Sequence, residues 1–209
     1  PLHDALPILA LSRAVTHPRA GNIGGGGFLV LQGAEGAPVA YDFRETAPGA
    51  AHPEMLLVDG EYSADRHHWS HIAVGVPGTV AGLFMAWQDA GSLPWAELVA
   101  PAIAQAEEGI AVTNGLARSL VEVRPRMERY PASIAKFSNE SRPLKAGGIW
   151  RQPDLAAALK RIAEQGPDGF YRGETADLIV AEMRRGGGII THADLAAYEP
   201  KRRKPIRGT

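Results

Sequence analysis

An arginine at the end of a predicted β-strand is the residue of this chain best suited to hold a substrate. Val39, Tyr41 and Phe43 alternate with small or polar residues, which is the pattern of a strand with one buried face. Arg44 follows directly. A guanidinium at a strand end can hold a carboxylate through two parallel hydrogen bonds. Arg44 is therefore our candidate substrate-binding residue.

The same residues allow a second interpretation, in which Arg44 serves only the fold. Asp42 falls on the same face of the strand as Arg44, and Glu45 follows in the sequence. Either carboxylate is a suitable ion-pair partner. Spacing alone leaves both interpretations open.

Four consecutive glycines, Gly24 to Gly27, invite a nucleotide-binding interpretation that their spacing excludes. A dinucleotide fingerprint needs glycines at positions i, i+2 and i+5, between a strand and a helix. Here the last position falls on Leu29 or Val30, and the block precedes a predicted strand at residues 28–32. We therefore expect the glycines to allow close backbone packing with positive φ angles.

No catalytic residue, metal site or cofactor is predicted in this chain. His67, His68 and His71 lie in a segment with no predicted helix and no carboxylate at a metalloprotease position, so we expect a solvated loop cluster. The chain has no cysteine and no recognisable serine-nucleophile motif. The chain therefore shows no convincing nucleophile of its own.

The composition is that of an ordinary globular protein. The 209 residues are 45% hydrophobic and 22% charged, with a net charge of −1. This balance gives no electrostatic reason to expect nucleic acid or an anionic membrane as a partner. No segment approaches the roughly 20 apolar residues of a membrane span, and no signal peptide is recognisable.

The elements that must position Arg44 are mostly helical, which predicts an α+β fold with one β-hairpin near its start. Helices are expected at residues 80–90, 95–108, 113–123, 153–165, 174–185 and 191–198. Thr79 is the expected cap of the first of them, and Pro125 the expected end of the third. Residues 49–78 and 124–151 read as irregular. A hairpin is marginal alone, so we expect its partner strands beyond Thr209.

The chain reads as an internal fragment with two parts. Pro7 interrupts the segment from Pro1 to Ile8, which fits neither a helix nor a strand. We expect residues 1–8 to be an unmatched, non-native segment and residues 9–209 to be a partial domain.

Three segments in order resemble the large subunit of the γ-glutamyltranspeptidases. They are Gly21 to Phe28, Asp42 to Pro48 and Gly75 to Leu83. The likeness continues through Phe170 to Gly173 and through the residues around Thr191 to Tyr198. It covers roughly residues 9–207. Several signatures in the right order are far more specific than any one glycine run.

The resemblance implies an N-terminal-nucleophile hydrolase fold, a four-layer αββα sandwich of which this chain is an incomplete part. Such proteins are made as one precursor that cuts itself into a large and a small subunit, which form a heterodimer. The small subunit's first residue, a threonine, attacks the γ-glutamyl amide of glutathione with its own α-amine as base. The glutamyl group then passes to water, an amino acid or a peptide. Lacking that threonine, the isolated chain is expected to be inactive.

Within the resemblance, Arg44 corresponds to the arginine that binds the substrate's α-carboxylate. Glu45, Thr46 and Pro48 correspond to residues that shape its loop. Family members are periplasmic or extracellular, which gives the expected location. Two alternatives remain open: a cephalosporin or glutaryl acylase of the same fold, and a non-catalytic carboxylate-binding module.

Overall fold

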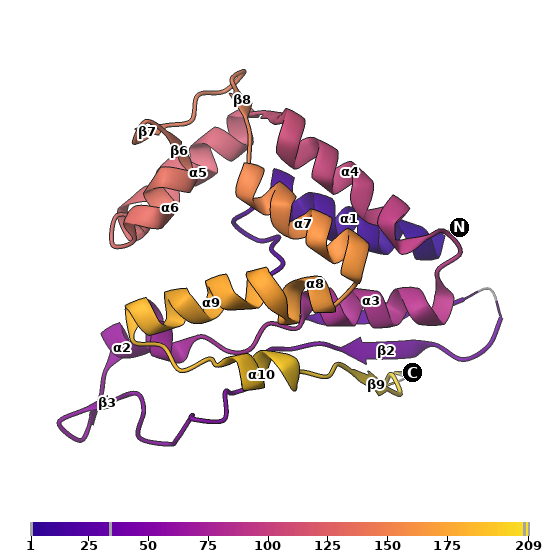
Figure 1. The fold of residues 1–209 in the computed structure, drawn as a ribbon, viewed down its shortest axis with the longest axis horizontal. Coiled ribbons are helices and arrows are strands. Elements are labelled where there is room, and N and C mark those ends of the chain that lie inside the picture. Colours follow the sequence, from indigo (N-terminus) through magenta and orange to yellow (C-terminus); the bar gives the residue numbers. More distant parts are fainter. Residues whose placement is uncertain (1, 34, 207, 209) are drawn as a thin grey trace.

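The computed structural model of the chain describes residues 2–33, 35–206 and 208. Helices form two of its layers, and a small sheet with helix α10 lies along one side (Figure 1). The helices are α1 (Leu2–Thr16), α2 (Ala64–Trp69), the 3-10 helix η1 (His71–Ala73), α3 (Thr79–Ala90), α4 (Trp95–Glu108), α5 (Asn114–Met127), α6 (Pro131–Lys136), α7 (Pro153–Gln165), α8 (Asp168–Tyr171), α9 (Gly173–Gly186) and α10 (His192–Ala196). The strands are β1 (Phe28–Leu31), β2 (Val39–Asp42), β3 (Leu57–Val58), β4 (Glu61–Tyr62), β5 (Ile110–Ala111), β6 (Ser138–Asn139), β7 (Arg142–Pro143), β8 (Ile149–Trp150) and β9 (Lys201–Arg203).

The predicted hairpin is present, and its third strand comes from this chain. Strands β1, β2 and β9 form an antiparallel sheet in the order β1-β2-β9. The expectation that all partner strands lie beyond Thr209 was wrong. The residues from Lys201 to Arg203 show no alternation of apolar and polar side chains, but ion pairs with two carboxylates hold this strand in place. Arg202 pairs with Asp89 of α3 and Arg203 with Asp42 of β2, each at 2.7 Å.

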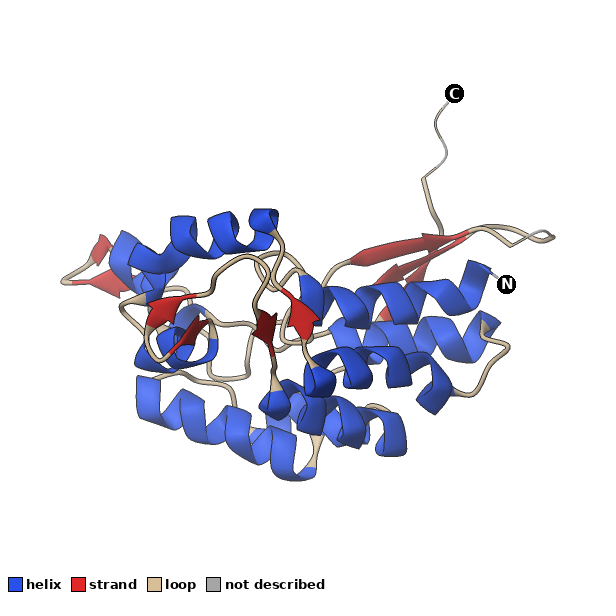
Figure 2. Cartoon of the chain, turned by 90° about the horizontal axis from the view of Figure 1, so that it is seen from above, coloured by secondary structure: helices blue, strands red, loops and turns tan. Residues whose placement is uncertain are grey.

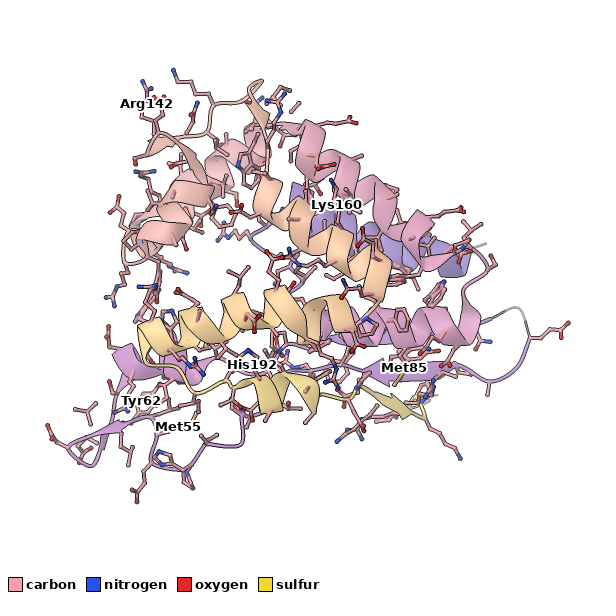
Figure 3. All side chains as sticks on the ribbon, in the orientation of Figure 1. Met55, Tyr62, Met85, Arg142, Lys160 and His192 are labelled. Carbon is pink, nitrogen blue, oxygen red and sulfur yellow. The ribbon has the colours of Figure 1, made fainter. Side chains whose placement is uncertain are left out.

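The two faces of this sheet differ sharply. Tyr41 and Phe43 are buried against α3, as the alternation predicted, and Met85 of α3 lies on the side facing the sheet (Figure 3). On the other face Phe28 is 67% exposed and Val30 is 60% exposed. The outer face of the sheet is thus uncovered and apolar along β1, with the charged side chains of Asp42, Lys201 and Arg203 beside it.

The main core lies among the helices, and in the view of Figure 2 the longest strands lie at one edge of them. Leu11 and Val15 of α1 are fully buried together with Val99 of α4 and Leu159 of α7. The indole of Trp95 donates a hydrogen bond to the carbonyl of Ile162 at 2.9 Å, which ties α4 to α7. This helical core forms the support on which the sheet and its loops rest.

Helix α1 begins at Leu2 and runs through Pro7, so the expectation that residues 1–8 form no regular element was wrong. Pro7 is buried, and the Asp4 carboxylate accepts hydrogen bonds from the backbone N–H groups of Ser92 and Leu93. These contacts and the packing of α1 on α4 offset the backbone hydrogen bond that proline cannot make. The boundary predicted after Ile8 lies within this helix.

Two further predictions about helix ends need correction. Helix α5 passes through Pro125 and ends two residues later at Met127, without the hydrogen bond that a proline nitrogen cannot donate to the preceding turn. Thr79 is the first residue of α3 rather than its cap, which is Gly78. Helices α4 and α7 have the predicted bounds.

The two stretches expected to be irregular contain short regular elements. Residues 49–78 include the β3-β4 hairpin, α2 and η1, and residues 124–151 include α6 and the β6-β7 hairpin. Strand β8 pairs with β5. Among the helices formed by the described residues, none has both the length and the apolar character needed to cross a membrane.

Candidate functional site

Arg44 lies where the chain leaves β2, and its side chain is 61% exposed. Its Nε atom is 3.5 Å from Oε2 of Glu45, an ion pair without a hydrogen bond. Among the described residues, the guanidinium makes no hydrogen bond. Its nitrogen atoms therefore remain available to an incoming carboxylate.

Asp42, the other partner considered for Arg44, is engaged elsewhere. Its carboxylate accepts a hydrogen bond from Nε of Arg203 at 2.7 Å and another from the backbone N–H of Arg44 at 3.2 Å. The Arg203 hydrogen bond, followed by that N–H, lowers the pKa of Asp42. Because Arg203 neutralises Asp42, the Glu45 carboxylate at 3.5 Å is the one of the two candidate partners that pairs with the Arg44 side chain.

A hollow of about 140 Å³ lies beside Arg44. It is lined by Asp42, Arg44, Glu45, Thr46, Tyr198, Glu199 and Lys201. Pockets for whole small ligands usually measure about 300–1,000 Å³. The hollow is smaller than such pockets and has room for one charged end of a ligand.

The loop that carries Arg44 is fastened at several points. Thr46 exchanges two backbone hydrogen bonds with Val76, at 3.3 and 2.8 Å. The N–H of Gly49 donates to Oδ1 of Asp194 at 2.7 Å, and the Tyr198 hydroxyl donates to the Arg44 carbonyl at 2.9 Å. An exposed arginine is thereby carried on a well-anchored backbone.

The glycine block supports the same loop from the other side. Gly27 exchanges backbone hydrogen bonds with Phe43, and the Gly25 carbonyl accepts from Gly78 and Thr79. A Cβ atom at Gly26 would lie 2.4 Å from the Phe43 carbonyl oxygen. The predicted close packing of the glycine backbone is confirmed. The expected positive φ angles were wrong, because none of the four glycines has one.

The three clustered histidines do not converge on one point. His67 and His68 lie in α2, where no helix was expected, and their rings stack at 4.5 Å. His71 turns away and contacts Oε1 of Glu182 through Nε2 at 2.8 Å. Within the described part of the chain, no group of three or more potential ligands could hold a metal ion.

A larger hollow of about 1,020 Å³ lies elsewhere, between the loop at residues 21–24 and the segment at residues 135–155. It shares no lining residue with the smaller hollow beside Arg44. Its size exceeds that of the Arg44 hollow, but the exposed guanidinium and the anchored loop identify the smaller one as the candidate site.

Two residues of the site, Asp194 and Tyr198, were given no role by the sequence. Asp194 completes a capping box with Thr191 at the start of α10, so only a helix cap could be read from its spacing. Nothing in the sequence indicates that the same carboxylate reaches Gly49, 145 residues away. Contacts at this range appear only in the folded chain.

Comparison with known proteins identifies the family. The sequence model described as Gamma-glutamyltranspeptidase matches residues 4–209, which includes most of the segment expected to lie outside the domain. A glutathione hydrolase proenzyme from Escherichia coli is 44% identical over 98% of this chain and 36% of its own length. The chain thus spans about a third of that relative.

Solved structures agree with this assignment and with the predicted α+β class. The γ-glutamyltranspeptidase of Helicobacter pylori superposes with a TM-score of 0.96 at 41% identity, covering 99% of this chain and 60% of that one. A cephalosporin acylase from Bacillus halodurans gives 0.83 at 29% identity, covering 98% and 39%. The fold is therefore part of an N-terminal-nucleophile hydrolase, and the chain belongs to the gamma-glutamyltranspeptidase family.

Proposed function

We propose that the full-length protein cleaves the γ-glutamyl amide of glutathione and related compounds, and passes the glutamyl group to water, an amino acid or a peptide. In this reaction Arg44 binds the α-carboxylate of the glutamyl group. The observation that carries the proposal is the Arg44 guanidinium, which is exposed beside a small hollow while Arg203 occupies the competing Asp42. Membership of the family supports the same assignment.

The chemistry needs a second polypeptide segment. The chain has no cysteine, and among the residues that line the Arg44 hollow only Thr46 carries an aliphatic hydroxyl, which belongs to the anchored loop. We assign the nucleophile to a threonine at the start of a small subunit cut from the same precursor, with its α-amine as base. The hydroxyl attacks the amide carbonyl, the amine departs, and an acyl-enzyme forms. The chain alone is then inactive.

The outer face of the β1-β2-β9 sheet is the surface we assign to the small subunit. Phe28 and Val30 are exposed there, although both are strongly apolar. In an αββα sandwich a second sheet covers such a face. This arrangement brings the second subunit next to the strand that ends at Arg44. By family membership, we place the mature heterodimer in the periplasm or outside the cell.

An acylase that removes glutaryl side chains from β-lactams is the second candidate, favoured by the structural likeness to the Bacillus halodurans cephalosporin acylase. A glutaryl group keeps the carboxylate of a γ-glutamyl group and lacks its α-amine. Arg44 suits both substrates equally. The choice between them depends on a site for the amine, which the small subunit would supply.

Turnover of two matched anilides tests the proposal. The full-length protein should hydrolyse γ-glutamyl anilide with a kcat/KM at least about a hundredfold above that for glutaryl anilide, because an unpaired amine site disfavours the second substrate. The opposite preference would establish the acylase. Binding of glutamate to the isolated chain by calorimetry, without turnover in the full-length protein, would favour the carboxylate-binding module.

A further inference from the structure

The segment around α10 contacts both ends of the loop that carries Arg44. Asp194 accepts a hydrogen bond from the backbone N–H of Gly49 at 2.7 Å, and Tyr198 donates one to the carbonyl of Arg44 at 2.9 Å. Tyr198 is 154 residues distant from Arg44 in the sequence. A short segment near the end of the described chain therefore fixes a loop near its start.

Tyr198 is itself held in one orientation. Its ring stacks on that of Tyr171 with centroids 5.7 Å apart and planes 4° apart. Tyr171 is buried, and its hydroxyl donates to the Pro77 carbonyl at 2.8 Å. A Cβ atom at Gly78 would lie 2.1 Å from the Tyr198 hydroxyl, so the loop at residues 77–78 closes the space around that group. The hydroxyl cannot move far without leaving the Arg44 carbonyl.

The hydroxyl is also a permanent donor. Burial, followed by the nearby charges of Asp42 and Glu45, raises the pKa of Tyr198 to about 12. At neutral pH the group stays protonated and can donate to a carbonyl. Its contact with Arg44 is therefore independent of pH over the working range of most enzymes.

We infer that Tyr198 is a positioning residue for substrate binding, because its hydroxyl fixes the Arg44 peptide plane and with it the direction of the guanidinium. The inference rests on the proposed function, in which Arg44 grips a carboxylate. A bidentate arginine–carboxylate pair requires a defined geometry. An exposed arginine side chain meets this requirement only if its backbone is held, and Tyr198 supplies that restraint at the residue itself.

The test is Tyr198→Phe in the full-length protein, assayed with γ-glutamyl anilide. The variant keeps the stacked ring and loses only the hydrogen bond to Arg44. We expect KM to rise about three- to tenfold, the usual effect of one hydrogen bond, with kcat within about twofold. Tyr41→Phe is the matched control, since it removes the hydrogen bond that the hydroxyl of Tyr41 in β2 donates to Asp89 of α3 at 3.0 Å. That control should leave KM unchanged.

A double variant separates positioning from general damage. If Tyr198 acts through Arg44, then Tyr198→Phe should have no further effect on KM in an Arg44→Ala background. An equal rise in both backgrounds, or an unchanged KM in the single variant, overturns the inference and leaves the proposed function intact. An unchanged KM in Arg44→Ala alone overturns the proposed role of Arg44 and this inference with it.

Discussion

At the scale of single residues, the site depends on how charges are paired at the end of β2. Two arginines and two carboxylates lie close together: Arg44, Arg203, Asp42 and Glu45. Arg203 takes Asp42 with a short contact of 2.7 Å, whereas Glu45 stays 3.5 Å from Arg44. This unequal pairing leaves Arg44 the more available of the two cations.

Removing Arg203 should therefore weaken substrate binding at a distance. In Arg203→Ala the unpaired Asp42 carboxylate competes for Arg44, and we expect KM for γ-glutamyl anilide to rise about two- to fivefold, the range for a largely exposed pair. Steady-state kinetics on the full-length protein give the measurement. Arg202→Ala, which breaks the pair with Asp89 instead, is the control.

A second substitution verifies the cause. Adding Asp42→Asn to Arg203→Ala removes the competing charge, so KM should return toward its original value. If the double variant binds as poorly as Arg203→Ala, competition by Asp42 is not the reason.

At the scale of elements, the sequence predicts those helix ends that a nearby proline or glycine determines. Helix α7 begins at Pro153 and ends before Gly166, and α4 ends before Gly109, so these helices have the expected bounds. Strand β9 could not be foreseen, because the ion pairs that hold it are made with Asp89 and Asp42, both distant in the sequence. Local rules also placed a break at Pro7, where packing on other helices prevails.

The candidate site also has one part that the sequence indicates and another that only the fold shows. Arg44 could be chosen from strand alternation and from the family signatures around it, and the structure places it beside the hollow. The role of Arg44 in substrate binding stays a prediction. Asp194 and Tyr198 lie about 150 residues away, and the hydrogen bonds that join them to the Arg44 loop exist only in the folded chain.

Gly24 and Gly26 provide a matched test of how the glycine block supports the loop. A Cβ atom at Gly26 meets the Phe43 carbonyl oxygen at 2.4 Å and the Glu45 nitrogen at 2.9 Å, whereas one at Gly24 meets nothing within 4 Å. Gly26→Ala should therefore lower the free energy of unfolding by about 1–3 kcal/mol, the usual cost of overpacking. Gly24→Ala should be near neutral. Thermal unfolding of both variants gives the measurement. Equal Tm values would contradict the close packing of Gly26 on the Arg44 loop.

At the scale of the whole molecule, the proposed function makes the chain one side of a larger assembly. Helix α3 covers the inner face of the β1-β2-β9 sheet, while its outer face exposes Phe28 and Val30. The proposed small subunit covers that face and completes the hollow beside Arg44. Binding of the carboxylate and attack on the amide are then divided between two subunits of one precursor.

A charge on the outer face should disturb this assembly. In Val30→Glu a carboxylate is buried between the two sheets without a partner, and we expect a clear loss of mature heterodimer. The yield of processed subunits on a denaturing gel, with size-exclusion chromatography, measures it. Leu178→Glu on α9 is the control, because Leu178 is 59% exposed, about as much as Val30. Equal yields of the two variants would remove the outer face from the interface.

The central claim, that Arg44 binds the α-carboxylate of a γ-glutamyl substrate, is tested most directly by Arg44→Ala with two anilides. One is γ-glutamyl anilide, and the other is 4-aminobutyryl anilide, which is the same acyl group without its α-carboxylate. Losing a charge-assisted bidentate contact costs about 2–4 kcal/mol, so KM for the first should rise about thirty- to several-hundredfold. The second substrate should be processed equally by both proteins. An unchanged KM for γ-glutamyl anilide, or an equal loss with both substrates, would contradict the claim.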